Sequence, residues 1–397
     1  MPSALTGQER IDFWILSSGQ FLLFCGFFSF FQFPLYIQHQ GGDEVQIGVI
    51  MGVTSLASTL LLPWIIALVD RVERRRVMLI GMILMEAATM ACIATEAPDV
   101  FMGTLMVLRG FGIAVYMNAS GAYIAQILPP EEKSRWIGIN FGFNQIAIGV
   151  GPLLGDLIIT RVGFPFFFFM ATAFIFSGML FILTITSRVP EPVERPFHPL
   201  ESLTYFFREI NGPRFRVPFI TLLLVAGVVS AVFNFTATFM QKIGLPSGVF
   251  FTVYAGVNVM CRFFISGRTD RLPRWLVVVP SLGVMALGLL AYSVTANLTT
   301  LVISAVLIGV GFGLSNPAML AQMLDRSPGN MQGMAVGLFH FSYQLGALSG
   351  APAFGFVAGS WGYPAMLWIS AALTIAAALV FMRTRAPAHQ PPLRPTV

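Results

Sequence analysis

Residues 138–165 read GINFGFNQIAIGVGPLLGDLIITRVGFP, and residues 337–364 read GLFHFSYQLGALSGAPAFGFVAGSWGYP. The two stretches align at a constant offset of 199 residues, which pairs Gly138 with Gly337, Gln145 with Gln344, Gly151 with Gly350, Gly163 with Gly362 and Pro165 with Pro364. The same offset pairs Gly110 with Gly309 and Gly112 with Gly311. The chain therefore repeats itself about halfway along.

The composition indicates a protein that is solvated by lipid. Of 397 residues, 56% are hydrophobic and only 10% are charged, which is more apolar surface than one soluble core can hide. The net charge of +5 comes from short clusters between apolar runs, so we interpret it as a topology signal and predict no nucleic-acid partner. Cys25, Cys92 and Cys261 lie far apart inside apolar segments. Their spacing indicates neither a disulfide framework nor a metal site, and we predict no metal and no cofactor.

The chain offers twelve apolar stretches of about the 20 residues that a bilayer-spanning helix needs. They lie near 13–37, 46–69, 77–95, 100–127, 136–160, 164–186, 214–240, 248–267, 275–293, 298–324, 331–357 and 362–382. The first is expected to be a retained span. We predict an all-α membrane protein with six-helix bundles at 1–186 and 214–397, joined by a cytoplasmic linker at 187–213, with a short cytoplasmic tail at the end. Two homologous halves of apolar helices are typical of secondary transporters.

Basic residues predict the orientation, because Lys and Arg gather on the cytoplasmic side of a membrane protein. Only Arg161 and Lys242 fall on one side of the predicted spans. The other side holds the Arg residues of 187–216 together with Arg10, Arg71, Arg74, Arg75, Arg76, Lys133, Arg135, Arg268, Arg271, Arg274, Arg326, Arg383, Arg385 and Arg394. Both termini and the central linker are therefore expected to be cytoplasmic.

Two predicted loops share a charged motif. The chain reads PWIIALVDRVERRR between spans 2 and 3 and RFFISGRTDRLPRW between spans 8 and 9. Both resemble the loop signature of the major facilitator superfamily, G-x-x-x-D-R-x-G-R-R, with Ile66 and Ser266 in place of its first Gly. The resemblance implies that these charged loops act in conformational switching, through Asp70, Arg71, Arg74, Arg75, Asp270 and Arg271. The alternative is a loop that only sets topology.

Spans 4 and 5 resemble two further signatures of that family. Span 4 holds RGFGIAVYMNASGAY, an intramembrane Arg followed by small residues. Span 5 holds Gly151, Pro152 and Gly155, which look like a signature found mainly in exporters and antiporters, with Asp156 where a second Gly is usual. These residues let the helix bend and let a neighbour approach closely, so we assign them to conformational switching. Ordinary helix packing is the alternative.

Ionisable side chains at membrane depth are costly and are candidate functional groups. Glu86 and Arg109 lie on consecutive antiparallel spans, each about nine residues from the shared loop, which puts both roughly 13–15 Å deep. We predict an ion pair that couples transport to protons, or a static structural pair. His340 and Asp156 are further candidates for proton coupling. Span 1 has no acid beyond Asp12, which weakens the antiporter hypothesis and favours its alternative, uptake or uncoupled facilitation.

The family resemblance implies a substrate site near the midplane, lined mainly by spans 1, 4, 7 and 10. Helical spacing puts several polar and aromatic side chains on faces that could line it. These predicted substrate-binding residues are Gln20, Phe24, Phe27, Phe31, Arg109, Tyr116, Asn144, Asn234, Thr238, Asn316 and Gln344. Such a lining suits a medium-sized amphipathic or aromatic solute, although packing and lipid contact are an alternative for the Phe residues.

These observations favour a monomeric transporter of a bacterial inner membrane, with a small-molecule substrate, protons and membrane lipids as partners. The leading hypothesis is export of an organic solute by alternating access in exchange for protons. Uptake or uncoupled facilitation is a second hypothesis, and a lipid flippase or membrane sensor is a third. The sequence holds no phosphate-binding glycine loop and no metal-ligand spacing, so we predict no enzyme activity.

Overall fold

The computed structural model describes residues 6–129, 132–188, 208, 210, 212, 214–265, 272–327 and 332–385. Helix is the regular structure throughout these residues. The elements run α1 (Gly7–Ser29), η1 (Phe30–Gln32), α2 (Phe33–His39), α3 (Glu44–Gly52), α4 (Thr54–Leu60), α5 (Leu62–Arg71), α6 (Arg74–Ala91), η2 (Cys92–Ala94), α7 (Val100–Ile127), α8 (Lys133–Arg161), α9 (Phe164–Thr184), α11 (Arg216–Ile243), α12 (Ser247–Met260), the π-helix η3 (Cys261–Ile265), α14 (Arg274–Ser293), α15 (Leu298–Asp325), α16 (Gln332–Met382) and η5 (Arg383–Arg385).

The helices of the described residues account for twelve spans. Ten helices are long and apolar enough to cross a membrane. Two further helical segments, 44–60 and 64–71, are bent by 57° relative to each other and together form an eleventh span. The last helix, α16, is 51 residues long and breaks at Gly362, whose φ is +83°. A straight helix of that length would measure about 77 Å, far more than the roughly 30 Å of a bilayer core, so α16 supplies two spans. This confirms the predicted all-α membrane fold.

Glycine contacts repeat in the two halves, which we name the first half (residues 6–188) and the second half (residues 214–385). A Cβ on Gly112 would lie 2.5 Å from the carbonyl oxygen of Gly81, and a Cβ on Gly311 would lie 2.6 Å from that of Ser281. Both contacts join the helices of one hairpin, α6 with α7 and α14 with α15. The sequence repeat is therefore also a packing repeat, because only glycine lets these backbones approach so closely.

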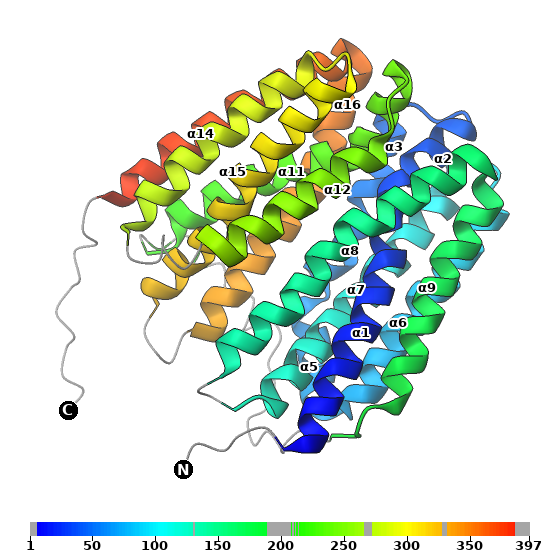
Figure 1. The fold of residues 1–397 in the computed structure, drawn as a ribbon, viewed down its shortest axis with the longest axis vertical. Coiled ribbons are helices and arrows are strands. Elements are labelled where there is room, and N and C mark those ends of the chain that lie inside the picture. The colour runs from blue at the N-terminus through cyan, green and yellow to red at the C-terminus, as the bar shows by residue number, and fades with distance from the viewer. Residues whose placement is uncertain are drawn as a thin grey trace.

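The two halves contact each other chiefly through α8 with α12 and through α3 and α4 with α16. In Figure 1 the ribbons of the halves converge where α2 and α3 lie and separate toward the end where α1 begins. We name the first of these the closed end. It holds Gln32, the last turns of α8 and the first turn of α12. The predicted linker, 187–213, lies largely outside the described residues, as do Asp270 and Arg271.

Candidate functional site

Arg109 lies inside the first half, where α1 changes to the 3-10 turn η1. At this break the amide of Phe30 donates to Phe27 O, although a regular α-helix would use Gly26 O. The buried guanidinium of Arg109 compensates by donating to Gly26 O at 3.2 Å and to Phe27 O at 2.9 Å. It also donates to Thr89 Oγ1 at 3.3 Å. Arg109 therefore binds two backbone carbonyls at the end of α1, where the regular helical hydrogen-bond pattern changes.

Aromatic rings cover the same guanidinium. Its carbon atom lies 3.5 Å from the ring centroid of Phe30 and 4.7 Å from that of Phe27. Both distances are within the range of a cation–π interaction, which is strongest in a desolvated site. The positive charge of Arg109 is thus stabilised by carbonyl dipoles and ring faces.

The predicted ion pair between Glu86 and Arg109 is absent from this structure. Among the described residues, no Glu86 oxygen lies within ion-pair distance of the guanidinium, and the buried Oε2 atom has no hydrogen-bond partner. Glu86 itself is half-buried on α6. The two groups share a membrane depth, but the guanidinium donates to carbonyls of α1 and to Thr89 of α6 instead. A carboxyl group in this setting can take up a proton without breaking an ion pair.

Amide side chains join α1 to α8 in the first half. The Nε2 atom of Gln20 donates to Asn140 Oδ1 at 3.2 Å and to Asn144 Oδ1 at 2.9 Å, and Asn140 Nδ2 donates to Ser17 Oγ at 3.1 Å. We name Ser17, Gln20, Asn140 and Asn144 the amide cluster. The side-chain oxygen of Gln20 is buried and has no partner among the described residues. The cluster therefore retains an unused hydrogen-bond acceptor.

The predicted aromatic residues divide between two environments. Phe24 is buried and stacks on Phe28, with 5.3 Å between the ring centroids. Tyr116 is also buried, and its ring lies edge-to-face with that of Phe24, with 6.5 Å between the centroids. Phe31 instead reaches the second half, where it contacts Phe233 at 4.9 Å and Phe251 at 5.2 Å. Phe24 on α1 is thus packed inside the first half, whereas Phe31 lies between the halves.

In the second half, the predicted polar residues lie on three helices. Asn234 donates to Ser230 Oγ at 3.1 Å, while Asn316 on α15 is half-buried. Gln344 on α16 donates to Ser58 Oγ of α4 at 2.6 Å and so joins the two halves. His340 is exposed, with its ring 5.6 Å from that of Phe339. Thr238 is buried close to the closed end.

The charged turn between α5 and α6 centres on Glu73, which sequence reasoning missed. Glu73 accepts a hydrogen bond from Ser187 at 2.6 Å and pairs with Arg76 at 2.6 Å and Arg75 at 3.4 Å. The Ser187 hydroxyl and the two guanidinium groups hold the pKa of Glu73 below its ordinary value. Arg74 donates to Ala122 O at 2.9 Å on α7, whereas Asp70 and Arg71 are exposed.

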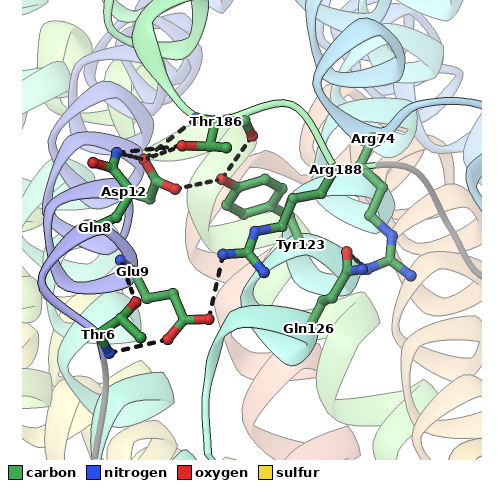
Figure 2. Close-up of polar contacts among 9 residues, drawn as sticks. All are labelled: Thr6, Gln8, Glu9, Asp12, Arg74, Tyr123, Gln126, Thr186 and Arg188. Atoms are coloured by element: carbon green, nitrogen blue, oxygen red, sulfur yellow. Dashed lines mark hydrogen bonds and ion pairs between the residues drawn. The ribbon is translucent and has the colours of Figure 1, made fainter.

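A second polar network, the Asp12 cluster, joins α1, α7 and the segment after α9 (Figure 2). Asp12 is fully buried, and its carboxylate accepts from Gln8 at 3.0 Å, from Tyr123 at 3.2 Å, and from the amide and hydroxyl of Thr186 at 3.3 and 3.2 Å. A buried carboxylate needs such donors, because water no longer solvates it. Asp12 thus holds the end of the first half together.

Buried polar groups join the halves at the closed end. Gln32 and Ser247 exchange two hydrogen bonds, at 2.8 and 3.0 Å, and Gln32 also donates to Pro152 O at 3.0 Å. The carboxylate of Asp156 on α8 accepts from the amide of Gly248 at 3.1 Å, in the first turn of α12. We name these five residues the latch. A negative group at a helix N-terminus is favourable because that end carries partial positive charge.

Glycines let the helices around the latch approach each other. A Cβ on Gly151 would lie 2.5 Å from Cys25 O on α1, and a Cβ on Gly155 would lie 3.1 Å from the side chain of Gln32. The segment that contains Pro152 therefore packs directly on the end of α1.

Known proteins share this architecture. A family model described as Major Facilitator Superfamily matches residues 16–268 and 247–396. The staphylopine export protein of Staphylococcus aureus is 24% identical over 355 residues, covering 86% of this chain and 88% of that protein. Multidrug resistance protein 2 of Bacillus subtilis is 24% identical over 361 residues, covering 88% of each. The crystal structure of the nucleoside transporter NupG superposes with a TM-score of 0.75 at 15% identity, covering 94% of this chain and 98% of that one. This chain, a non-enzymatic membrane transporter, belongs to the Major Facilitator Superfamily.

Proposed function

We propose that the protein is a secondary active transporter that exports a small amphipathic or aromatic organic solute in exchange for protons. The observation that carries this proposal is the amide cluster, whose Gln20 side-chain oxygen is buried and accepts no hydrogen bond from any described residue. An unsatisfied acceptor inside a protein costs free energy, which a hydrogen bond from a solute would recover. The phenyl rings along α1 supply the apolar surface that an amphipathic solute needs.

Alternating access would use the two six-helix bundles, 1–186 and 214–397, as rigid bodies. The latch and the contact of Gln344 with Ser58 join the bundles in this conformation. Their separation, together with closure of the opposite end, would expose the amide cluster to the other side of the membrane. The charged turn around Glu73 would then act in this change of conformation, as the resemblance to the family's loop signature implies.

Proton exchange would take place at Glu86. Its carboxyl group lies at membrane depth near Arg109, and its Oε2 atom has no hydrogen-bond partner in the part of the chain that the structure describes. A change of protonation there alters the local charge by one unit while Arg109 keeps its bonds to α1. Asp156 and His340 are secondary candidates.

Export is the direction that the names of two relatives favour, one an export protein and one a multidrug resistance protein. The resemblance of span 5 to the exporter signature supports the same direction. We further propose a monomer in a bacterial inner membrane with both termini in the cytoplasm. Uptake, uncoupled facilitation and lipid movement are the competing outcomes of the test below.

The test is transport in proteoliposomes, with ethidium and tetracycline as the first probes. Counterflow of a probe, with the same pH on both sides of the membrane, measures binding and alternating access. Accumulation of the probe under an imposed pH gradient measures proton coupling. Glu86→Gln should retain counterflow and lose accumulation. Glu96→Gln is the matched control, because Glu96 is exposed before α7.

Each alternative has its own result. Accumulation by Glu86→Gln at the wild-type rate would remove Glu86 from the mechanism. Counterflow without any proton movement in the wild type would identify a facilitator. Movement of a labelled phospholipid but of no soluble probe would identify a flippase.

A further inference from the structure

A cavity of about 400 Å³ lies at the closed end, apart from the amide cluster, and is lined by Gln38, Glu44, Thr238, Gln241, Lys242 and Tyr363. Its volume is within the range of small-molecule sites. We propose that this cavity binds a small solute carrying both an ammonium and a carboxylate group, and that the bound solute holds the closed end shut. The proposal goes beyond the transport function and does not depend on it.

Tyr363 and Thr238 form the rigid floor of the cavity. Tyr363 is 2% exposed, and its ring packs against Phe239 at 5.3 Å and Phe235 at 6.4 Å. It lies directly after Gly362, whose positive φ turns the chain between the two spans of α16. The tyrosine hydroxyl donates to Glu44 Oε1 at 3.3 Å, which fixes the carboxylate at one wall. Such a floor is organised before a ligand arrives, which lowers the cost of binding.

Opposite charges face the same cavity without pairing with each other. Glu44 lies in the first turn of α3, and Lys242 lies in the last turn of α11. Among the described residues, no carboxylate is within ion-pair distance of Lys242, whose Nζ atom lies 5.7 Å from the centroid of the Tyr363 ring. Each charge is stabilised by its own helix end, an acid at an N-terminus and a base at a C-terminus. Both therefore remain available to a ligand.

The pattern selects a zwitterion among possible ligands. A carboxylate group of the ligand would pair with Lys242, and its ammonium group would pair with Glu44. The amides of Gln38 and Gln241 offer further donors and acceptors around the rim. Lys and Arg gather on the cytoplasmic side of membrane proteins, and Lys242 is one of only two such residues predicted on the opposite side. Its presence there is therefore not explained by a role in setting the topology.

The cavity joins the two halves, which makes binding dependent on conformation. Gln38 and Glu44 belong to the first half, and Thr238, Gln241, Lys242 and Tyr363 belong to the second. When the halves separate at this end, the acid and the base separate as well. A ligand that pairs with both charges must therefore favour the closed end.

Binding is tested by calorimetry on the full chain in lipid nanodiscs, with glycine, 4-aminobutyrate and 6-aminohexanoate as probes. Hexanoate and hexylamine, which carry one charge each, are the controls. We expect binding of at least one zwitterion, and a loss of about tenfold or more in affinity for Glu44→Gln and for Lys242→Met, because each removes one charged contact. Asp43→Asn and Arg161→Gln are matched controls, because both residues are exposed charges at the same end.

The conformational effect is tested by electron–electron distance measurement between spin labels at Phe101→Cys and Leu298→Cys. Both residues are exposed, at the closed-end starts of α7 and α15. A bound zwitterion should increase the short-distance population in the wild type but not in the Glu44→Gln variant. No zwitterion binding, equal binding of singly charged probes, or binding without a change of population would overturn the proposal. None of these results bears on solute export, which the proteoliposome assay tests separately.

Discussion

Gly48 on α3 offers a direct perturbation of the closed end. A Cβ at this position would lie 2.4 Å from Ala351 O and 3.1 Å from Gly355 Cα, both on α16 of the second half. Ordinary contact begins near 3.4 Å, so Gly48→Ala requires the two helices to move apart by about 1 Å. The collision is with backbone atoms, which cannot rotate away. We expect the substitution to destabilise the closed end specifically.

The magnitude follows from the packing. Overpacking of a well-fitted contact costs about 1–3 kcal/mol, and the cost applies only while α3 and α16 touch. The equilibrium between the closed and open forms of this end should therefore shift by about 5- to 150-fold toward the open form. Alanine also stabilises a helix by up to about 1 kcal/mol relative to glycine, but this gain is common to both forms and cancels. Gly355→Ala should act alike, because its Cβ would lie 2.5 Å from Glu44 O.

Spin labels at Phe101→Cys and Leu298→Cys report the separation of the halves. The three native cysteines are buried, so labelling is directed to the two introduced cysteines. The long-distance population should rise in Gly48→Ala. Gly103→Ala is the matched control, because a Cβ there meets nothing within 4 Å. The double variant with Gly355→Ala should shift the equilibrium by less than the sum of the two, because one separation relieves both clashes. Identical distance distributions for Gly48→Ala and Gly103→Ala would refute the argument.

Three further predictions concern the first half. The pKa of Glu73 is lowered in the folded state, so its ionised form stabilises the fold at pH values above the ordinary pKa of 4.5. This stabilisation is lost as the pH falls through the folded-state pKa. The thermal midpoint of Glu73→Gln should therefore change less with pH below about 4.5 than that of the wild type. Tyr123→Phe removes one donor from the buried Asp12 carboxylate and should lower the free energy of unfolding by about 1–3 kcal/mol, and an unchanged thermal midpoint would contradict this. Arg109→Lys keeps the charge but cannot reproduce the planar contacts with two carbonyls and two rings, so a loss of about 2 kcal/mol or more is expected in the same assay.

The sequence predicts the helices and their repeat well, because both depend on local pattern. Gly112 and Gly311 match at the repeat offset, and in the structure each contacts the neighbouring helix of its hairpin. The number of spans follows from apolar length alone. The division of α16 at Gly362 is likewise visible in sequence, because Gly163 occupies the matching position and also has a positive φ, +100°.

Side-chain partners are less predictable, because depth in the membrane does not define direction around a helix. Equal spacing from a shared loop puts Glu86 and Arg109 at one depth, yet Arg109 bonds to α1 and Glu86 does not pair with it. The competing partners are the carbonyl oxygens of Gly26 and Phe27, at the break in α1. Neither a charge pattern nor helical spacing reveals such a break, although Pro34, which has no amide hydrogen to donate to Phe30 O, lies close to it.

Contacts between the halves are the least predictable part, because they join residues that are distant in sequence and belong to different repeats. Gln32 and Ser247 are 215 residues apart, and no motif contains either of them. Asp156 gives the one local signal, because it stands where the family pattern has glycine. The structure gives this departure a physical reason: the carboxylate caps the first turn of α12 across the interface, which a glycine could not do. A residue that departs from a family pattern inside a packing segment is therefore a sound place to search for contacts between the halves, and Asp156 leads to the latch in this way.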